Sequence, residues 1–257
     1  MSAVTLDLWN TLIYLRPDAE ETYMADQLAI GARVLRDAPT RPAATHRSAA
    51  QLRAAFERSY TAAVKASVRG RSVTPREQIV RAAKATGRHV NPNAYLRGLR
   101  AVVRTTPFRR APGALSLLRQ LRNAGYRVAV ISNTVGEPGV YLRPILTSMG
   151  FDRFVERYVF SDELPWTKPS PRIFRYTLRL LGERPMNAVH VGDGWSDIEG
   201  ARRARYRGSI LFSGLHAYGA RYRELFLSGS PQLPPASYRV RRLAEVGPLV
   251  RRMLPTA

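Results

Sequence analysis

The chain has 257 residues, in which 41 lysines and arginines outnumber 19 acidic residues and give a formal net charge of +22. It contains no cysteine, which excludes disulfides, thiol catalysis and cysteine-ligated metal sites. No apolar run approaches the roughly 20 residues of a membrane-spanning helix, and the amino terminus lacks the basic leader of a signal peptide. We therefore expect a cytoplasmic protein that has no membrane partner.

The positive charge comes almost entirely from arginine, because Lys65, Lys84 and Lys168 are the only lysines. Such a charge favours anionic partners, among them phosphorylated metabolites, nucleic acid and acidic lipid. An arginine-rich solvated surface explains the same composition equally well. Nucleic acid stays open but is not favoured, since no recognised nucleic-acid motif accompanies the charge.

The first predicted element is a buried strand that begins at Val4 and leads directly into Asp7, which turn-forming residues follow. In open α/β sheets, ligands bind beyond the carboxyl ends of the parallel strands. A carboxylate at that position projects into the binding crevice while its strand stays in the core. Asp7 is therefore a candidate functional residue.

The region from Pro17 to Arg104 carries helix signals and almost no strand signals. Asp18 followed by Glu21 predicts a capping box that opens the first helix. A second helix is indicated by apolar residues at four-residue steps, which form one stripe: Leu52, Phe56, Tyr60 and Val64.

Two further helices are predicted in the same region. Thr74-Pro75-Arg76-Glu77 combines a capping residue with a proline at the first helical position, and Gly87 ends that helix. Asn91-Pro92 opens the fourth helix. Four antiparallel helices of this kind predict a small bundle.

From Pro112 onward, helices and strands alternate, which indicates a parallel sheet. The predicted strands cover 126–134, 158–160, 188–193 and 209–212, the helices 113–124, 140–149 and 171–181, and a loop at 228–235 precedes a strand near Tyr238 and a terminal helix. The first strand belongs to this second half. The predicted fold is α/β, a Rossmann-like parallel sheet core (1–15 and 105–257) with an inserted all-α four-helix cap (16–104).

Polar residues recur where these strands end, in the order Asp7, Ser132, Asn133, Lys168, Asp193 and Asp197. Each alone is weak, because such residues are common in turns. Their shared setting at strand ends is more specific. The histidines show no metal-ligand spacing, and His190, inside an apolar run, is interpreted as a core residue.

These residues resemble the motifs of the haloacid dehalogenase-like (HAD) hydrolase superfamily over nearly the full chain. The first motif is Asp7-Leu8-Trp9-Asn10-Thr11-Leu12, the second Ile131-Ser132-Asn133, the third Lys168-Pro169 and the fourth Gly192-Asp193-Gly194-Trp195-Ser196-Asp197. The helical insert between the first two motifs resembles the cap of the family's first structural class.

The resemblance implies that Asp7 is a nucleophile that forms an aspartyl intermediate, which water then hydrolyses. It also implies a Mg²⁺ ion held by oxygen ligands, because an attacking carboxylate and a phosphate repel each other. Its ligands would be Asp7, Asp193 and the Trp9 backbone carbonyl, with Asp197 as a further ligand or a supporting residue.

The remaining motif residues are expected to bind the phosphoryl group of a small phosphorylated substrate. Ser132 would donate to a phosphoryl oxygen, and Lys168 would offset the negative charge that collects on the phosphate and the carboxylates. Trp9, Thr11 and Asn133 complete the predicted substrate-binding set. Arginines of the cap could also bind anionic substrate groups, the candidates being Arg16, Arg33, Arg36 and Arg53.

The sequence departs from the family pattern at Trp9, where most phosphatases of the family carry an acid–base aspartate. Such a group is typically worth about 10² to 10⁴ in rate. Three interpretations stay open: a Mg²⁺-dependent phosphatase, a hydrolase similar to the 2-haloacid dehalogenases, which have an aromatic residue here, and a non-catalytic protein that binds an anionic partner. The acidic Gly192-Asp193 motif favours the first.

Overall fold

A computed structural model of the protein describes residues 2–41, 47–215, 219–220, 223–227 and 231–254. Six parallel strands form its central sheet, in the order β5-β4-β1-β6-β7-β8. Their bounds are β1 Ala3–Leu6, β4 Arg127–Ser132, β5 Arg157–Phe160, β6 Ala188–Gly192, β7 Gly208–Phe212 and β8 Tyr238–Val240. The predicted α/β class with a parallel sheet is confirmed.

The first strand of the chain lies in the middle of this sheet. Leu6 of β1 pairs with Val130 of β4 on one side and with Val191 of β6 on the other. The residues that follow these positions therefore emerge at the same edge of the sheet. This register brings together the carboxyl ends of β1, β4 and β6, where the polar motif residues lie.

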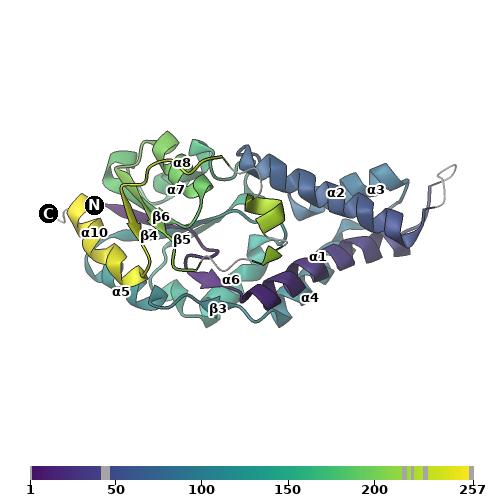
Figure 1. Ribbon diagram of the computed structural model, residues 1–257, viewed down its shortest axis with the longest axis horizontal. Coiled ribbons are helices and arrows are strands. Elements are labelled where there is room, and N and C mark those ends of the chain that lie inside the picture. Colours follow the sequence, from purple (N-terminus) through teal and green to yellow (C-terminus); the bar gives the residue numbers. More distant parts are fainter. Residues whose placement is uncertain (1, 42–46, 216–218, 221–222, 228–230, 255–257) are drawn as a thin grey trace.

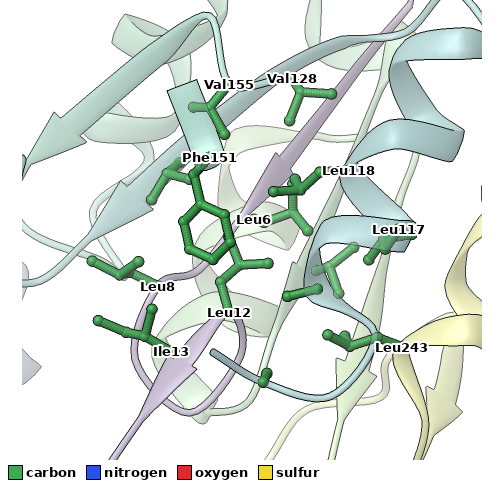
Figure 2. Close-up of a cluster of buried hydrophobic side chains, with 14 of the residues drawn as sticks. Leu6, Leu8, Leu12, Ile13, Leu117, Leu118, Val128, Phe151, Val155 and Leu243 are labelled. Carbon is green, nitrogen blue, oxygen red and sulfur yellow. The ribbon is translucent and has the colours of Figure 1, made fainter. Parts of the chain in front are cut away.

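Helices cover both faces of the sheet (Figure 1). Helices α5 (Ala114–Asn123) and α10 (Val246–Met253) contribute to one apolar cluster, and α7 (Pro171–Leu180) and α8 (Trp195–Ala204) to another on the opposite face. The helix α6 (Gly139–Ser148) follows β4 along the chain. Figure 2 shows part of the first cluster, in which Leu6 packs among residues such as Leu118, Val128 and Phe151.

The strands alternate between these two faces, as the period of two requires. In β6, Val189 and Val191 belong to the α5 and α10 side, whereas Ala188 belongs to the α7 and α8 side. His190 is two residues after Ala188, so its side chain lies on the same face of the sheet. Its ring accordingly packs against Phe174 of α7, with ring centroids 5.0 Å apart.

The structure also contains elements that the sequence analysis did not predict. Helix α8 was missed, as was a two-stranded antiparallel pair of β2 (Ile13–Tyr14) and β3 (Arg109–Arg110). The exposed arginines of β3 have no strand signature. Short 3-10 turns occur at Phe151–Arg153, Ser161–Glu163, Pro185–Asn187 and Leu243–Glu245, and a π-helical turn at Arg223–Leu227.

The segment between β2 and β3 contains α1 (Pro17–Asp37), α2 (Ala49–Val68), α3 (Pro75–Thr86) and α4 (Pro92–Thr105). The predicted stripe of α2 is confirmed, because Leu52, Phe56, Tyr60 and Val64 are all buried. These helices share an apolar cluster of their own, and in Figure 1 they extend away from the sheet, opposite the chain termini. The domain bounds 16–104 remain a prediction.

Two of the predicted helix starts can be compared directly. Thr74 is the N-cap residue of α3, as predicted, and also forms a capping box with Glu77, while Gly87 ends the helix with a positive φ of 66°. The capping box of Asp18 and Glu21 is wrong. Proline 17 already occupies the first turn of α1, so Arg16 is the N-cap residue and makes no side-chain capping bond.

The predicted loop at 228–235 falls partly outside the described residues, since 228–230 are not among them, while residues 231–235 have no regular secondary structure. Among the described helices, none combines the length and the apolar content that a bilayer crossing requires.

Candidate active site

Asp7 follows β1 directly and is held at the carboxyl edge of the sheet. Its backbone NH donates to the carbonyl of Val191 at 2.8 Å, and the residue is 5% exposed. The chain then turns tightly, because the backbone NH groups of Leu12 and Ile13 both donate to the Leu8 carbonyl. Asn10 adopts a positive φ of 54° in this turn, a conformation that asparagine tolerates better than most residues.

Lys168 lies against Asp7 and links it to the fourth motif. Its ammonium group forms an ion pair with Asp7 Oδ1 and another with Asp197 Oδ1 at 2.7 Å, and its side chain is 2% exposed. The backbone of Lys168 is fixed from both sides by Asn133, whose Oδ1 accepts from the Lys168 NH at 2.8 Å and whose Nδ2 donates to the Lys168 carbonyl at 2.9 Å. The side chain of Asn133 therefore positions Lys168.

Asp197 is placed by the first turn of α8. Its Oδ2 accepts a hydrogen bond, 3.1 Å long, from the backbone NH of Gly194, which is the N-cap residue of that helix. The other oxygen, Oδ1, therefore faces Lys168. A side chain at Gly192 would overlap the Asp197 carboxyl, so only glycine lets this carboxylate approach the end of β6. Both oxygens of Asp197 thus already accept hydrogen bonds.

His190 supports the same carboxylate from within the sheet. Its Nε2 lies 3.0 Å from Asp197 Oδ1, and its Nδ1 lies 2.8 Å from the Thr5 hydroxyl of the neighbouring strand. The sequence analysis took His190 for a core residue, and it is fully buried. Its contact with Asp197 was missed, although the alternation along β6 places it beside Thr5.

Three carboxylates converge on the strand ends, because ligand oxygens of Asp7, Asp193 and Asp197 all lie within 4.8 Å of one another. Burial and the two neighbouring carboxylates raise the pKa of Asp7, and Lys168 opposes this effect. Burial alone would raise the pKa of Asp197, but Lys168 and His190 lower it well below its usual range. This set of hard oxygen donors can hold a divalent cation.

A cavity of about 370 Å³ opens above these residues, a size typical of small-molecule sites. Asp7, Trp9, Asn133, Lys168, Asp193 and Asp197 all contribute to its lining. The hydroxyl of Ser132 is buried at the end of β4 and has no hydrogen-bond partner among the residues that the structure describes. Thr11 is fully buried, and its hydroxyl donates to Asp7 Oδ2 at a long distance of 3.4 Å.

Residues of the helical segment form the roof of the cavity and are bonded to loops of the sheet. Gln78 donates to the Val135 carbonyl at 2.7 Å, and Ser67 at the end of α2 accepts from the Thr167 hydroxyl at 2.9 Å through its carbonyl. The helices are thus closed over the site, next to Lys168.

The loop after β4 contributes a buried carboxyl to the cavity that the sequence analysis missed. Glu137 is 5% exposed, lines the cavity, and accepts from Gln27 of α1 at 3.3 Å. Burial raises the pKa of Glu137 to about 8, and the neighbouring donors of Gln27, Tyr23 and Trp9 offset only part of that effect. No local sequence pattern marks Glu137, because its neighbours are distant in the chain.

The cap arginines considered in the sequence analysis do not line the cavity. Arg16, Arg36 and Arg53 are exposed and pair with carboxylates on their own helices or beside them, and Arg33 is exposed as well. The expectation that they bind the substrate is not supported by this geometry.

Comparison with known proteins places this geometry in a family. A phosphoglycolate phosphatase from Colwellia psychrerythraea is 34% identical over 115 residues, which are 45% of this chain and 47% of that protein. The human haloacid dehalogenase-like hydrolase domain-containing protein 3 is 40% identical over 91 residues, which are 35% of each chain. The chain thus spans half or less of the length of these relatives.

A solved structure of similar fold is the HAD phosphatase from Thermococcus onnurineus, with a TM-score of 0.61 and 20% identity over 99% of this chain and 98% of that one. At this identity the likeness concerns the fold. The model of the family described as haloacid dehalogenase-like hydrolase matches residues 1–205. Together with the four converging motifs, this match shows that the chain belongs to the haloacid dehalogenase-like hydrolase family.

Proposed function

We propose that the protein is a phosphatase that hydrolyses a monoester of a small phosphorylated substrate, with Asp7 as the nucleophile and Mg²⁺ as the cofactor. The observation that carries this proposal is the position of Asp7, which lies in the lining of a cavity against a buried lysine and within a cluster of carboxylates. The name of the Colwellia psychrerythraea relative, a phosphoglycolate phosphatase, supports the same reaction.

The donor set fits Mg²⁺, because this ion prefers carboxylate and carbonyl oxygens and keeps several waters. Asp7 and Asp193 would hold it directly, with the Trp9 carbonyl as the third protein ligand that the family resemblance implies. Asp197, whose oxygens face Lys168, His190 and Gly194, orients Lys168 beside Asp7. When bound, the ion offsets the repulsion between the carboxylates and the phosphate and polarises a phosphoryl oxygen.

In the first half of the reaction, a carboxylate oxygen of Asp7 attacks phosphorus and the ester P–O bond breaks. Asp7 then carries the phosphoryl group. The departing alcohol takes a proton from water, because the side chain of Trp9 cannot act as a general acid. Lys168 stabilises the negative charge that develops on the transferred group. The Ser132 hydroxyl, which has no partner, donates to a phosphoryl oxygen.

In the second half, water attacks the phosphorus of the aspartyl phosphate, and the bond between phosphorus and the Asp7 oxygen breaks. Inorganic phosphate leaves, the Asp7 carboxylate is regenerated, and the proton lost by the water goes to solvent or to the product phosphate. The net reaction is hydrolysis of one ester bond. Asn133 contributes by keeping the Lys168 backbone in place throughout.

Release of phosphate and of chloride distinguishes the three interpretations. The protein is incubated with acetyl phosphate, an aryl phosphate and 2-chloropropionate, each with and without Mg²⁺. Phosphate release that requires Mg²⁺ supports the proposal. Metal-free chloride release would instead indicate a dehalogenase, and no turnover of any substrate would indicate a non-catalytic binding protein.

A further inference from the structure

The cavity is lined by more acidic than basic side chains, although the protein as a whole is strongly basic. The chain carries a net charge of +22, yet among the described residues Lys168 is the only cationic side chain that lines the cavity. The carboxylates of the lining are Asp7, Glu20, Glu137, Asp193 and Asp197. Lys168 is already paired with two of them, so its charge is not available to the organic part of a substrate.

Two of these carboxyls lie on the wall formed by α1 and the loop after β4. Glu137 accepts from Gln27 at 3.3 Å, and Glu20 accepts from the backbone NH of Gly219 at 2.7 Å. Neither forms an ion pair with a cation in the described part of the chain. A carboxylate buried without a partner cation is costly, and an incoming cationic group removes that cost.

The same wall is aromatic. The rings of Trp9 and Tyr23 lie 6.1 Å apart and both border the cavity, as does Tyr60. The Tyr23 hydroxyl is fully buried beside Glu137 and Gln27. Aromatic faces next to carboxylates attract ammonium groups, and they do so more strongly when water is excluded.

We infer that the substrate is a phosphate monoester whose organic part carries an ammonium group, which Glu137, Tyr23 and Trp9 bind while Asp7 faces the phosphate. This inference rests on the proposed function. It gives the site a substrate class different from that in the name of the Colwellia psychrerythraea relative, because the carboxylate of phosphoglycolate would face Glu137 and Glu20 with no cation to receive it. A carboxylate that is desolvated on this wall would meet no compensating cation among the described lining residues, which disfavours its binding.

The chemistry of the reaction fits the same class of substrate. Trp9 replaces the general acid of related phosphatases, so the alcohol must leave without a proton from that position. An ammonium group near the ester oxygen withdraws electrons and makes the departing alkoxide a weaker base. The ammonium group that binds to the wall therefore also makes the alcohol a better leaving group. This matters because position 9 supplies no general acid for the departure of the alcohol.

The test compares three phosphate monoesters of similar size: 2-aminoethyl phosphate, 2-hydroxyethyl phosphate and phosphoglycolate. With Mg²⁺ present, we expect kcat/KM for the amine to exceed that for the hydroxyl compound about 10-fold, because a charge-assisted contact is stronger than a neutral one. We expect it to exceed that for phosphoglycolate by about 10² or more. Equal values for the amine and the hydroxyl compound, or a preference for phosphoglycolate, would overturn the inference.

The variant Glu137→Gln removes the charge and keeps the shape of the side chain. We expect the amine-to-hydroxyl ratio of kcat/KM to fall close to one, mainly through a higher KM for the amine. The matched control is Glu57→Gln, which changes a carboxylate on α2 that pairs with Arg53 and should keep the wild-type ratio. An unchanged ratio in Glu137→Gln would contradict the assignment of this residue.

Two further measurements separate this inference from the proposed function. If an aryl phosphate is hydrolysed with Mg²⁺ but the amine is not preferred, the phosphatase proposal stands and the inference fails. If nothing is hydrolysed, the preference of the wall for an ammonium group is still tested by binding. The Asp7→Asn variant is titrated calorimetrically with 2-aminoethyl phosphate and with phosphoglycolate. Tighter binding of the amine supports the inference, and equal or weaker binding contradicts it. If Glu137→Gln does not fold, Glu20→Gln is measured in its place and should lower the same ratio.

Discussion

Lys168 Nζ lies 2.7 Å from Asp197 Oδ1, inside the protein and beside the carboxylate of Asp7. Burial alone would lower the pKa of Lys168, but Asp197 and Asp7 raise it above its usual range, so the ammonium stays charged. The lysine depends on a carboxylate that is itself fixed by a helix start and a histidine. The position of the Lys168 ammonium group thus depends on three elements of the fold: β1, which Asp7 follows, the start of α8, and β6, which carries His190.

The variant Lys168→Met tests this arrangement. Removing one partner of a buried ion pair leaves carboxylates without compensation, and we expect the free energy of unfolding to fall by about 3 to 5 kcal/mol. Phosphatase activity should fall by about 10² or more, because the charge on the transferred group loses its stabilisation. Urea unfolding and kcat are measured together. The exposed Lys84→Met serves as the control, and equal effects of the two substitutions would contradict the assigned role.

The variant Gly192→Ala tests the close approach of Asp197 to β6. A Cβ at Gly192 overlaps the Asp197 carboxyl, whereas a Cβ at Gly194 lies 3.6 Å from Asp197 Oδ2. We expect Gly192→Ala to lower stability by about 1 to 3 kcal/mol and to reduce kcat as Lys168 shifts. Gly194→Ala should have the smaller effect on both quantities. The reverse order would show that Asp197 is not held as described.

The variant Trp9→Asp tests whether the missing acid limits the rate. We expect hydrolysis of alkyl phosphates to rise by about 10-fold to 10²-fold, within the usual range for a positioned acid, while aryl phosphates, whose leaving groups need less help, change little. The ratio of the two rates is the measurement. Loss of contacts with Tyr23 and Phe108 should lower stability, so folding is verified by circular dichroism. No gain on alkyl phosphates would favour the dehalogenase or binding interpretations.

An ion pair distant from the sheet edge that carries Asp7 gives a prediction for the pH dependence of stability. Burial alone would raise the pKa of Glu156, but hydrogen bonds and ion pairs with Arg127 and Arg122 lower it. Because the folded pKa is below the ordinary value of about 4.3, the stabilisation is present above that pH and is lost as the pH falls through the lowered value.

The variant Glu156→Gln should therefore be less stable than the wild type by about 1 kcal/mol at neutral pH, since the paired arginines are partly exposed. The two proteins should converge in stability in strong acid. Urea unfolding across the pH range measures this, and kcat should be unaffected. A constant difference at every pH would mean that the charge of Glu156 is not the cause.

The sequence predicted the positions of the strand ends more accurately than it predicted the side chains that contact them. Asp7 and Asp193 follow apolar runs, and runs of this kind determine where buried strands end. The family resemblance named Lys168 and Asp197 as site residues, but their ion pair was not predicted, because the two residues are distant in the sequence. The start of α1 was assigned wrongly, since Pro17 was not weighed against Asp18.

Residues that act through distant partners could not be found in this way. His190 differs from a purely apolar core residue only in its neighbours Thr5 and Asp197, which come from another strand and a helix. Glu137 lies in a loop, and its burial depends on how α1 packs over that loop. Tertiary packing decides both positions, and local pattern carries little information about it.

The central claim is that Asp7 attacks phosphorus and carries the phosphoryl group. It is tested most directly by rapid quenching of a reaction with an aryl phosphate and Mg²⁺, followed by mass analysis of the peptides. The account predicts the mass of one phosphoryl group on the peptide that contains Asp7, formed before phosphate release. It also predicts that Asp7→Asn folds but neither carries this mass nor turns over. Phosphate release at wild-type rates by Asp7→Asn, or a phosphoryl group on another residue, would contradict the account.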